Sequence, residues 1–377
     1  MTGTAAPLSG IRVLDAASFI AGPLAASLLG DLGADVVKAE PQGGDPLRRI
    51  GGVLDDEISA TFAFANRGKR GVAFDLAAEE GARRLASLAA ASDIVVHNQR
   101  PAAAERLGLR SASVVVEITA FGDRGPYAER PALDPIVQAM SGIAALTGEP
   151  DGEPRRAAAP VVDVSAALTA ALGALGALRA HERSGEAQVV TVSLFEVGLM
   201  LNSPAFAMRS ARGGPLERLG NASHALLADQ FAAADGLVWL AIWEQRQWRR
   251  LCEVLSLEDL AGDEAYGSNA RRIANQERLR PKLARAIADR RAEELRASLE
   301  EAGIPAAVTL SLEQIPDDPH VRESGAIRSE ARLPGPDLAL PAGPLRFDGE
   351  RPDPGRPAPR LGEHTAEVIA ELLGDDA

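Results

Sequence analysis

Apolar residues in the first part of the chain fall into short runs separated by longer amphipathic segments. The run at residues 11–15 predicts a strand, residues 23–32 after Gly22 predict a helix, and residues 35–40 predict a second strand. A strand, a helix and a strand in this order form a βαβ unit, whose two strands lie parallel in one sheet.

The same alternation continues to about residue 194. Further strands are expected at residues 71–76, 93–98, 113–119 and 188–194. Helices are expected at residues 79–90, 135–146 and 165–182. We therefore predict an α/β fold, in which a mostly parallel sheet carries helices on both faces.

The pattern changes after about residue 225. Asp235-Gly236 lies between two strand-like runs, which is typical of a β-hairpin, and helices are expected at residues 245–255, 277–288 and 292–302. Residues 334–359 contain eight prolines, as in an extended linker, and residues 362–373 predict a last helix. The predicted domains are a large α/β domain at 1–225, a smaller α+β domain at 226–330, and a return segment at 331–377 that completes the large domain.

Composition narrows the classes of function. The 40 Lys and Arg residues against 53 Asp and Glu residues give a formal net charge of −13, which argues against a nucleic-acid or anionic membrane partner. Cys252 is the only cysteine, which excludes an internal disulfide and a zinc site built on several thiolates. Residues 1–10 lack the regions of a secretory signal, and the longest uncharged stretch is too short to span a bilayer. We expect a soluble, cytoplasmic protein.

Common nucleotide-binding and hydrolase motifs are missing from the sequence. The turn after residues 11–15 has no G-x-G-x-x-G, and the chain has neither G-x-x-x-x-G-K-[ST] nor G-x-S-x-G. These absences disfavour NAD binding by the standard fingerprint, a phosphate loop and a serine hydrolase. The five histidines have no metal-ligand spacing, so no metal site is expected.

Asp163 is the one charged residue between Ala157 and Leu178. An aspartate before an Ala/Leu-rich helix is a preferred N-cap, because its side chain accepts backbone N–H groups at the start of the helix. An ionised carboxylate in an apolar site can also act as a covalent nucleophile. The two roles are compatible, and the residues alone leave both open.

Basic residues gather near the ends of the predicted strands, where ligands bind in open α/β sheets. They could form a solvated surface with local acidic partners, or bind an anionic ligand such as a nucleotide that carries phosphates. These residues are Lys38, Arg48, Arg49, Arg67, Lys69, Arg70, Arg100 and Arg106.

Short motifs follow one another in a fixed order along almost the whole chain. They lie at residues 10–15, 21–23, 32–40, 44–46, 66–70, 74–76, 93–98, 121–127, 134–142, 147–150, 193–196, 302–305 and 359–365. In this order they resemble the motifs of family III CoA-transferases, the family that also includes formyl-CoA transferase, carnitine CoA-transferase and α-methylacyl-CoA racemase. The likeness is weaker between about residues 200 and 230.

The resemblance implies a Rossmann-like large domain, a small domain, and an interlocked homodimer whose active sites lie between subunits. It matches Asp163 to the family's catalytic aspartate. By resemblance, this carboxylate attacks an acyl-CoA thioester to form a mixed anhydride, the released thiolate makes an aspartyl-CoA thioester, and a carboxylic acid collects the CoA. The implied substrates are an acyl-CoA and a carboxylic acid, with no metal and no permanently bound cofactor.

The resemblance also implies contacts to CoA. These are Ile20 and Ala21 at the pantetheine and reacting sulfur, Phe74 at the adenine, and Asn98 and Arg106 at the nucleotide. We add Lys38 and Lys69 as CoA contacts from their charge and placement. Ala77 stands where a relative has a lysine, so one ammonium contact is expected to be missing.

Two departures from related sequences bear on the activity. Leu133 stands where racemases have a histidine that transfers a proton, which disfavours racemisation, although Glu244 falls near the racemase glutamate. Residues 220–222 (Gly-Asn-Ala) are followed by residues 223–227 without the glycine loop of formyl-CoA transferases. A bulkier or more hydrophobic acyl group than formyl is therefore expected, and His224 could contact the substrate or be structural.

The leading hypothesis is an acyl-CoA:carboxylate CoA-transferase. One alternative is an acyl-CoA racemase or isomerase of the same family, which exchange of the α-hydrogen with solvent would reveal. The other is a non-catalytic partner subunit that binds CoA esters. Asp163 argues against the last, because a support subunit does not need that side chain.

Overall fold

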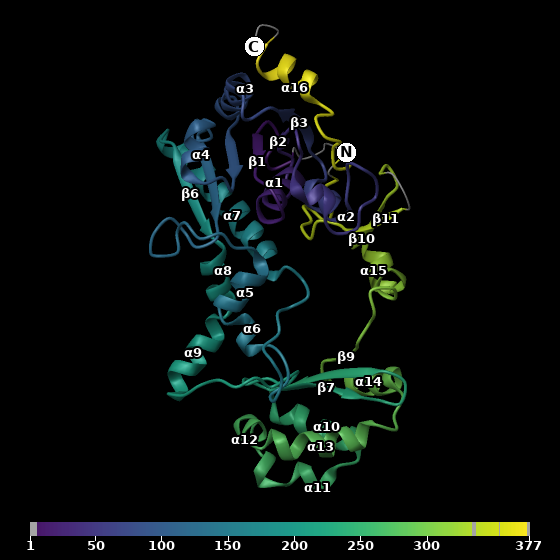
Figure 1. The fold of residues 1–377 in the computed structure, drawn as a ribbon. Coiled ribbons are helices and arrows are strands. Elements are labelled where there is room, and N and C mark those ends of the chain that lie inside the picture. Colours follow the sequence, from purple (N-terminus) through teal and green to yellow (C-terminus); the bar gives the residue numbers. More distant parts are fainter. Residues whose placement is uncertain (1–5, 334–336, 354, 375–377) are drawn as a thin grey trace. The chain divides into compact units, whose positions relative to one another are not determined.

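The computed structural model describes residues 6–333, 337–353 and 355–374 (Figure 1). The chain divides into two units. The large unit contains Met1–Ile143, Arg156–Met208 and Pro319–Ala377, and the small unit contains Ala144–Arg155 and Arg209–Asp318. These bounds differ from the predicted small domain at 226–330. The small unit also includes the short segment Ala144–Arg155, and its main part runs from Arg209 to Asp318.

Six strands form one sheet in the large unit, in the order β3-β2-β1-β4-β5-β6, and every neighbouring pair is parallel. The prediction of an α/β fold with a mostly parallel sheet is confirmed. This order is that of the Rossmann fold, and β1 and β4 lie side by side where the order reverses. The strands are β1 (Arg12–Ala16), β2 (Asp35–Pro41), β3 (Arg70–Phe74), β4 (Ile94–His97), β5 (Val114–Thr119) and β6 (Gln188–Ser193).

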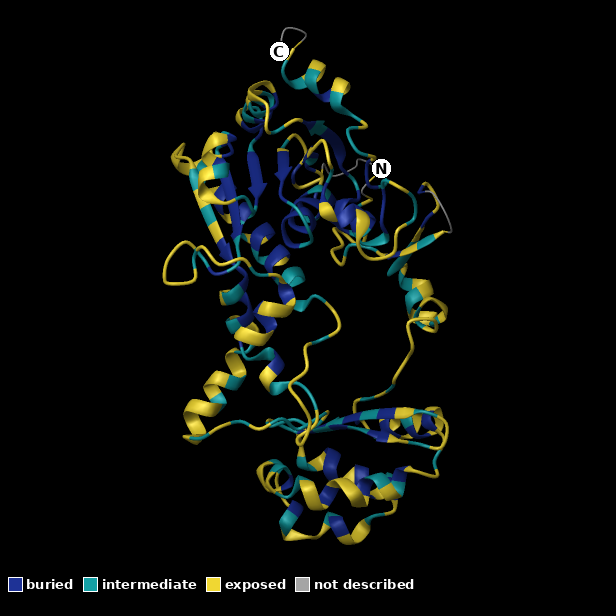
Figure 2. Cartoon of the chain, viewed as in Figure 1, coloured by how far each residue is buried: buried dark blue, intermediate teal, exposed yellow. Residues whose placement is uncertain are grey.

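Helices cover both faces of this sheet, which explains why the inner strands are almost continuously apolar. Val13 on β1 packs with α1 and α7 on one face, and Val37 on β2 packs with α3, α4 and α16 on the other. Figure 2 shows these strands as buried. The helices are α1 (Ala21–Asp31), α3 (Glu79–Ala90), α4 (Pro101–Arg106), α7 (Val161–Ser184) and α16 (Thr365–Leu372).

α7 begins four residues earlier than the sequence pattern indicated. By length and composition it could cross a membrane, but its small residues Ala166, Ala170 and Ala174 pack in the core of the large unit, where α7 contacts α1. The helix expected at residues 135–146 is divided into α5 (Asp134–Met140) and α6 (Ile143–Leu146). Gly142 lies between them with φ +88°, a left-handed backbone that a helix does not continue through.

Several short elements of the chain were not predicted. They include α4 and also η1 (Pro46–Arg49), α2 (Ala60–Asn66), α8 (Leu194–Leu201), α9 (Ser203–Arg212), α15 (Pro319–Ser324) and the antiparallel pair β10 (Ile327–Glu330) and β11 (Leu338–Pro341). Residues 334–336 and 354 of the Pro-rich segment lie outside the described residues. The last helix, α16, docks on β3, because Arg70 pairs with Glu367 and Glu371 at 3.2 and 2.6 Å.

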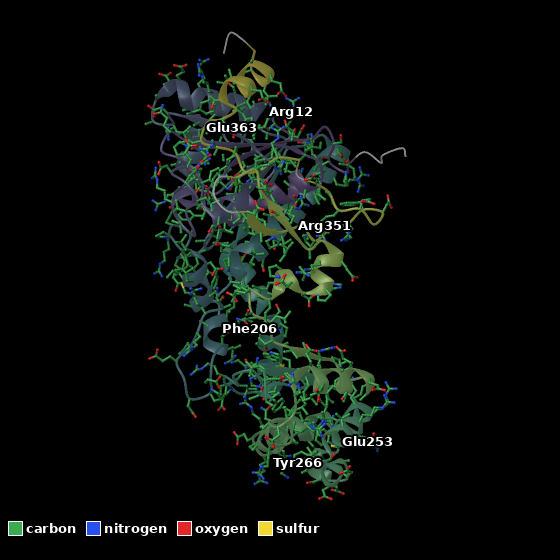
Figure 3. All side chains as sticks on the ribbon, turned by 90° about the vertical axis from the view of Figure 1, so that its right-hand side faces the viewer. Arg12, Phe206, Glu253, Tyr266, Arg351 and Glu363 are labelled. Carbon is green, nitrogen blue, oxygen red and sulfur yellow. The ribbon has the colours of Figure 1, made fainter. Side chains whose placement is uncertain are left out.

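The small unit combines an antiparallel sheet with helices, as the hairpin and helix patterns predicted. Its core includes Trp248, Leu251 and Leu279, and Tyr266, labelled in Figure 3, packs against Trp248 with ring centroids 6.0 Å apart. The strands are β7 (Leu227–Ala232), β8 (Leu237–Ile242) and β9 (Ala306–Val308). The helices are α10 (Gln245–Leu255), α11 (Glu258–Ala261), α12 (Asn269–Ala274), α13 (Gln276–Ile287) and α14 (Ala292–Glu301), with short turns η2 (Glu264–Tyr266) and η3 (Ile315–Asp317).

Candidate active site

The large unit has a cavity of about 840 Å³ where the strand order reverses between β1 and β4. Its wall is formed by the segments that follow β1, β4 and β5, together with the loop before α5 and the start of α7. Ligands of open α/β folds bind in this crevice, at the carboxyl ends of the strands. Asp163 lines the cavity together with Ile20, Ala21 and Asn98. The structure therefore brings the predicted nucleophile and three of the predicted CoA contacts to one cavity.

Asp163 is the third residue of α7, and its carboxylate has no hydrogen-bond partner among the residues that the structure describes. The start of α7 is instead capped by Asp134, whose Oδ2 accepts the N–H groups of Val162 and Asp163 at 2.8 and 3.2 Å. The N-cap role considered for Asp163 is therefore wrong, because Asp134 from another helix fills it. Burial first, and then the Asp134 charge, raise the pKa of Asp163 to about 7.

Asp134 is itself held by Gln138, four residues later on α5. Gln138 Nε2 donates to Asp134 Oδ1 at 2.5 Å, and Gln138 Oε1 accepts the N–H of Ala157 at 2.8 Å. Both side chains are buried. This pair ties α5 to the segment that leads into Asp163, and so fixes the position of the carboxylate in the cavity wall.

The loop at residues 17–20, between β1 and α1, forms the opposite part of the wall and carries Ile20. Asn98 donates from Nδ2 to the Ser18 carbonyl at 2.9 Å and accepts the Ser18 N–H at Oδ1 at 3.1 Å. Both polar atoms of the Asn98 amide group therefore bind the backbone of Ser18. Gly22 follows the loop in α1, where an added Cβ would lie 2.2 Å from the Ala17 Cβ, so only glycine allows this close approach.

Lys38 and Lys69 lie beneath this loop and are fully buried. Lys69 Nζ donates to Asp15 at 2.7 Å and to Asn66 at 2.8 Å, and Lys38 Nζ is 3.1 Å from Asp45. Burial lowers the pKa of Lys69 to about 8, whereas for Lys38 the effect of burial is outweighed by Asp15 and Asp45, which raise its pKa. The prediction that these lysines contact CoA is not supported by their position, because neither ammonium reaches a cavity surface.

A smaller cavity of about 150 Å³ adjoins the larger one and shares Ser18 and Gln99 with it. Leu76 from the segment after β3 lines it, together with Leu107 from the end of α4. Arg106, which is exposed, donates to the Leu76 carbonyl at 2.9 Å beside this cavity. Phe74 is 4 % exposed and lies in the apolar core below rather than in either cavity wall.

Three of the six arginines singled out near the strand ends bind carboxylates. Arg48 pairs with Glu40 at 2.6 Å, Arg67 pairs with Asp31 at 2.5 Å, and Arg70 holds α16. Arg100, Arg130 and Arg156 instead line the large cavity, and none of the three forms an ion pair with a described residue. Arg100 was predicted from its place after a strand, whereas Arg130 and Arg156 were not, since no strand end marks their segments.

Leu133 also lines the large cavity and is 50 % exposed, so the position that holds a histidine in racemases is apolar here. Glu244 lies in the small unit before α10, where its N–H donates to Gln247 Oε1 at 3.1 Å. His224 lies in the same unit with Nε2 2.8 Å from the Glu217 carbonyl. Among the residues that the structure describes, no group of three or more His, Cys, Asp or Glu could hold a metal ion.

Known proteins of similar sequence show which family the chain belongs to. The model of CoA-transferase family III matches residues 8–365. The chain is 34 % identical to the succinate–glutarate CoA-transferase of Agrobacterium fabrum over 97 % of this chain and 96 % of that protein. It is likewise 34 % identical to the succinyl-CoA:mesaconate CoA-transferase of Haloarcula hispanica, with 97 % and 96 % covered.

A solved structure is similar along the whole length. The crystal structure of a CAIB/BAIF family protein from Brucella suis aligns with a TM-score of 0.85 at 30 % identity, covering 98 % of this chain and 100 % of that chain. The fold, the cavity at the switch point and these matches define a CoA-transferase. The chain belongs to CoA-transferase family III, and the resemblance noted in the sequence is confirmed.

Proposed function

We propose that this CoA-transferase moves CoA from an acyl-CoA to a carboxylic acid through covalent intermediates on Asp163. The observation that carries the proposal is the Asp163 carboxylate itself, which lines the large cavity without a hydrogen-bond partner in the described chain. A carboxylate that is neither paired nor capped keeps its oxygen lone pairs available for attack on a bound thioester. Asp134, by contrast, uses its oxygens on backbone and Gln138 donors.

The proposed chemistry conserves the thioester bond energy. An Asp163 oxygen attacks the acyl-CoA carbonyl carbon, the C–S bond breaks, and CoA leaves as the thiolate. The thiolate attacks the Asp163 carbonyl carbon of the mixed anhydride, which releases the donor acid and leaves an aspartyl-CoA thioester. The acceptor carboxylate attacks this thioester to form a new anhydride, and the thiolate released then takes the acceptor acyl group, which regenerates the Asp163 carboxylate. CoA and the acyl-CoA are substrates, and the proposal needs no permanently bound cofactor.

We place the nucleotide end of CoA at the smaller cavity and the thioester in the larger one. The shared lining by Ser18 and Gln99 supports a path between them, along which the pantetheine would pass Ile20 and Ala21. Arg106, exposed beside the smaller cavity, is the proposed contact to a phosphate. Asn98 lines the larger cavity but its amide binds the Ser18 backbone, and Phe74 is buried in the core, so we assign both to shaping the site.

The proposed acyl group is a short dicarboxylic acid. The relatives named above act on succinate, glutarate and mesaconate according to their names. Arg130 and Arg156 line the same cavity as Asp163 and form no ion pair with described residues, so a guanidinium is available for a distal carboxylate. Such groups are bulkier than formyl, as the missing glycine loop led us to expect.

We also propose that two copies of this chain form an interlocked homodimer in the cytoplasm. Large apolar residues on α7, α8 and α9 of the large unit are exposed, which is unusual on a free surface. Among them are Leu172 at 71 %, Met200 at 70 % and Phe206 at 48 % exposure, the last labelled in Figure 3. Light scattering should give twice the chain mass, and a Leu172→Glu variant should shift the protein toward monomer. A monomeric wild-type protein would contradict this assignment.

A transfer assay tests the proposed function. Succinyl-CoA is incubated with glutarate, mesaconate or oxalate, and new acyl-CoAs are separated by chromatography. Wild-type protein should form the CoA ester of at least one acceptor, and Asp163→Asn should not. Glu196→Gln is the matched control, since Glu196 is the exposed third residue of α8 and does not line the cavity. A fully active Asp163→Asn protein would refute the mechanism. Deuterium uptake at the α-carbon without transfer would favour an isomerase instead.

A further inference from the structure

The loop at residues 17–20 has an unusual backbone where it faces the large cavity. Phe19 has φ +66°, a left-handed conformation that costs free energy in any residue with a Cβ atom. Among the described residues only Phe19, Ser256 and Asp348 have a positive φ without being glycine. Of these, only Phe19 lines the cavity that contains Asp163. Such strain persists only where the surroundings hold the backbone in place.

Two polar side chains provide that support at Ser18 and Phe19. Asn98, at the end of β4, forms reciprocal hydrogen bonds with the Ser18 carbonyl and N–H at 2.9 and 3.1 Å. Asp45, which is 3 % exposed, accepts the Phe19 N–H at Oδ1 at 3.2 Å. Three backbone groups of two successive residues are therefore bound by side chains from two other segments of the large unit.

Asp45 is in turn fixed by a backbone N–H group and a buried lysine. Its Oδ1 also accepts the Leu47 N–H at 2.9 Å, and its Oδ2 lies 3.1 Å from Lys38 Nζ. Lys38 Nζ also donates to the Ala17 carbonyl, at the start of the same loop. The buried Lys38 therefore stabilises the loop from inside the protein, although its ammonium group does not line the cavity.

We propose that Asn98 and Asp45 are positioning residues for the transfer reaction. They hold the strained Ser18–Phe19 backbone so that the loop keeps the reacting thioester against Asp163. The proposal rests on the proposed covalent function of Asp163. Neither residue touches the reacting atoms, and both act through the loop. A misplacement of about 1 Å costs on the order of 100-fold in rate, so a rigid loop can matter as much as a direct contact.

The first test separates positioning by Asn98 from direct binding of the nucleotide. Asn98→Ala and wild-type protein are mixed with succinyl-CoA, and the rate of covalent modification of Asp163 is measured by rapid quench and intact-mass analysis. We expect a rate about 10- to 100-fold lower in Asn98→Ala. The affinity for adenosine 3′,5′-bisphosphate, which carries the nucleotide half of CoA without pantetheine, should change by less than about 2-fold, because Asn98 binds Ser18.

Asn202→Ala is the matched control for this test. Asn202 is also partly buried in the large unit, and its Nδ2 donates to the Ser141 carbonyl at 2.9 Å, but it does not line the cavity. Its variant should lose a comparable hydrogen bond and keep the wild-type rate of Asp163 modification. A general loss of rate in both variants would overturn the positioning role of Asn98.

The second test addresses the Phe19 backbone and does not depend on Asn98. Phe19→Ala and Phe19→Gly both remove the ring, but glycine also removes the strain of the left-handed backbone. We expect Phe19→Gly to melt at a higher temperature than Phe19→Ala. We also expect it to modify Asp163 about 10-fold more slowly, because the released loop no longer holds the thioester. Opposite changes in stability and rate are not expected of a residue with only a structural role.

The outcomes distinguish this proposal from the function on which it rests. A wild-type protein that forms no adduct on Asp163 would overturn both. A wild-type adduct, with unchanged rates in Asn98→Ala and equal rates in the two Phe19 variants, would overturn only the positioning role. A parallel loss of nucleotide affinity and rate in Asn98→Ala would show that Asn98 binds CoA directly.

Discussion

Asp15 and Asp163 are both aspartates of the large unit close to the reversal of strand order, but their surroundings differ. Asp15 is fully buried, with Lys69 at 2.7 Å and Lys38 at 3.6 Å, and these charges lower its pKa even though burial alone would raise it. Asp163 is partly buried, has no cation or N–H donor among the described residues, and its pKa is raised to about 7. One carboxylate is neutralised inside the fold, and the other lies unpaired in a cavity wall.

The difference separates charged residues that stabilise the fold from charged residues that are available for the reaction. A buried ion cluster in which each partner has hydrogen bonds can hold a loop, as Lys38 and Asp45 do for residues 17–20. An unpaired carboxylate in a cavity wall lowers the stability of the fold, so its presence there indicates a function. A raised pKa in a cavity is likewise typical of functional sites.

Replacing Asp163 by Asn should reduce transfer by at least about 10³-fold, because the amide is a poor nucleophile. The variant should also be more stable than wild type. The folded-state pKa of Asp163 is raised from 3.8 to about 7, so ionisation opposes folding, and wild-type stability falls as the pH rises between these values. Thermal melts at pH 4 and pH 8 should therefore show a larger gain for Asp163→Asn at pH 8. An equal or smaller gain at pH 8 would count against an unpaired Asp163.

Replacing Asp15 by Asn should have the opposite result. It leaves two buried ammonium groups without their shared carboxylate, and we expect a loss of about 3–5 kcal/mol in the free energy of unfolding. Since the folded-state pKa of Asp15 is lowered, its contribution to stability is present above the unfolded-state pKa and is lost as the pH falls through the folded-state value. Urea unfolding at pH 7 measures the effect. A loss below about 1 kcal/mol would show that the cluster is not held together by charge.

Replacing Asp134 by Asn should change the pH dependence of Asp163. Wild-type modification by succinyl-CoA should rise with pH through about 7, as the carboxylate ionises. Asp134→Asn removes the like charge, which is the second cause of the raised pKa after burial, so the midpoint should move to lower pH but not to the ordinary value. The asparagine oxygen can still accept the Val162 N–H. An unchanged midpoint in rapid-quench experiments across pH 5 to 9 would contradict the coupling of the two aspartates.

Replacing Arg106 by Gln should have the smallest effect. Its guanidinium is exposed, so loss of one phosphate contact should weaken the affinity for free CoA by about 2- to 5-fold. Titration calorimetry at two salt concentrations measures it, and the difference from wild type should shrink at high salt. An affinity equal to that of wild type at low salt would remove Arg106 from the proposed contacts.

The periodicity of apolar residues was enough to predict most of the strands and helices. All six strands of the large sheet and the helices α3, α10 and α14 lie within two residues of their predicted bounds, because their apolar patterns report burial directly. The short helices α2 and α8 were missed, since seven or eight residues give too few turns for a clear helical period, and α9 was missed because it buries no residue. The break at Gly142 was missed because one glycine within a helical pattern does not by itself reveal a positive φ.

The candidate site was only partly predictable for a physical reason. Asp163 could be singled out because it is isolated among apolar residues, but its capping partner Asp134 is 29 positions away and no local pattern connects them. Lys38 lies in the middle of β2 and Lys69 directly before β3, rather than at the carboxyl ends of these strands. Their burial depends on Asp15 and Asp45, which pair with them only after the sheet has formed. The sequence shows where charged residues lie along the chain. Whether a charged side chain can bind a ligand depends on the ion pairs that it forms in the folded protein.

The most direct test of the central claim is to trap the intermediate on Asp163. The protein is incubated with succinyl-CoA, treated with hydroxylamine or borohydride, and digested for peptide mapping by mass spectrometry. We expect modification at Asp163 in the wild-type protein and no modification at position 163 in the Asp163→Asn variant. Asp134 and Asp15 should stay unmodified. Transfer of CoA without any modification of Asp163, or modification of a different carboxylate, would contradict the central claim.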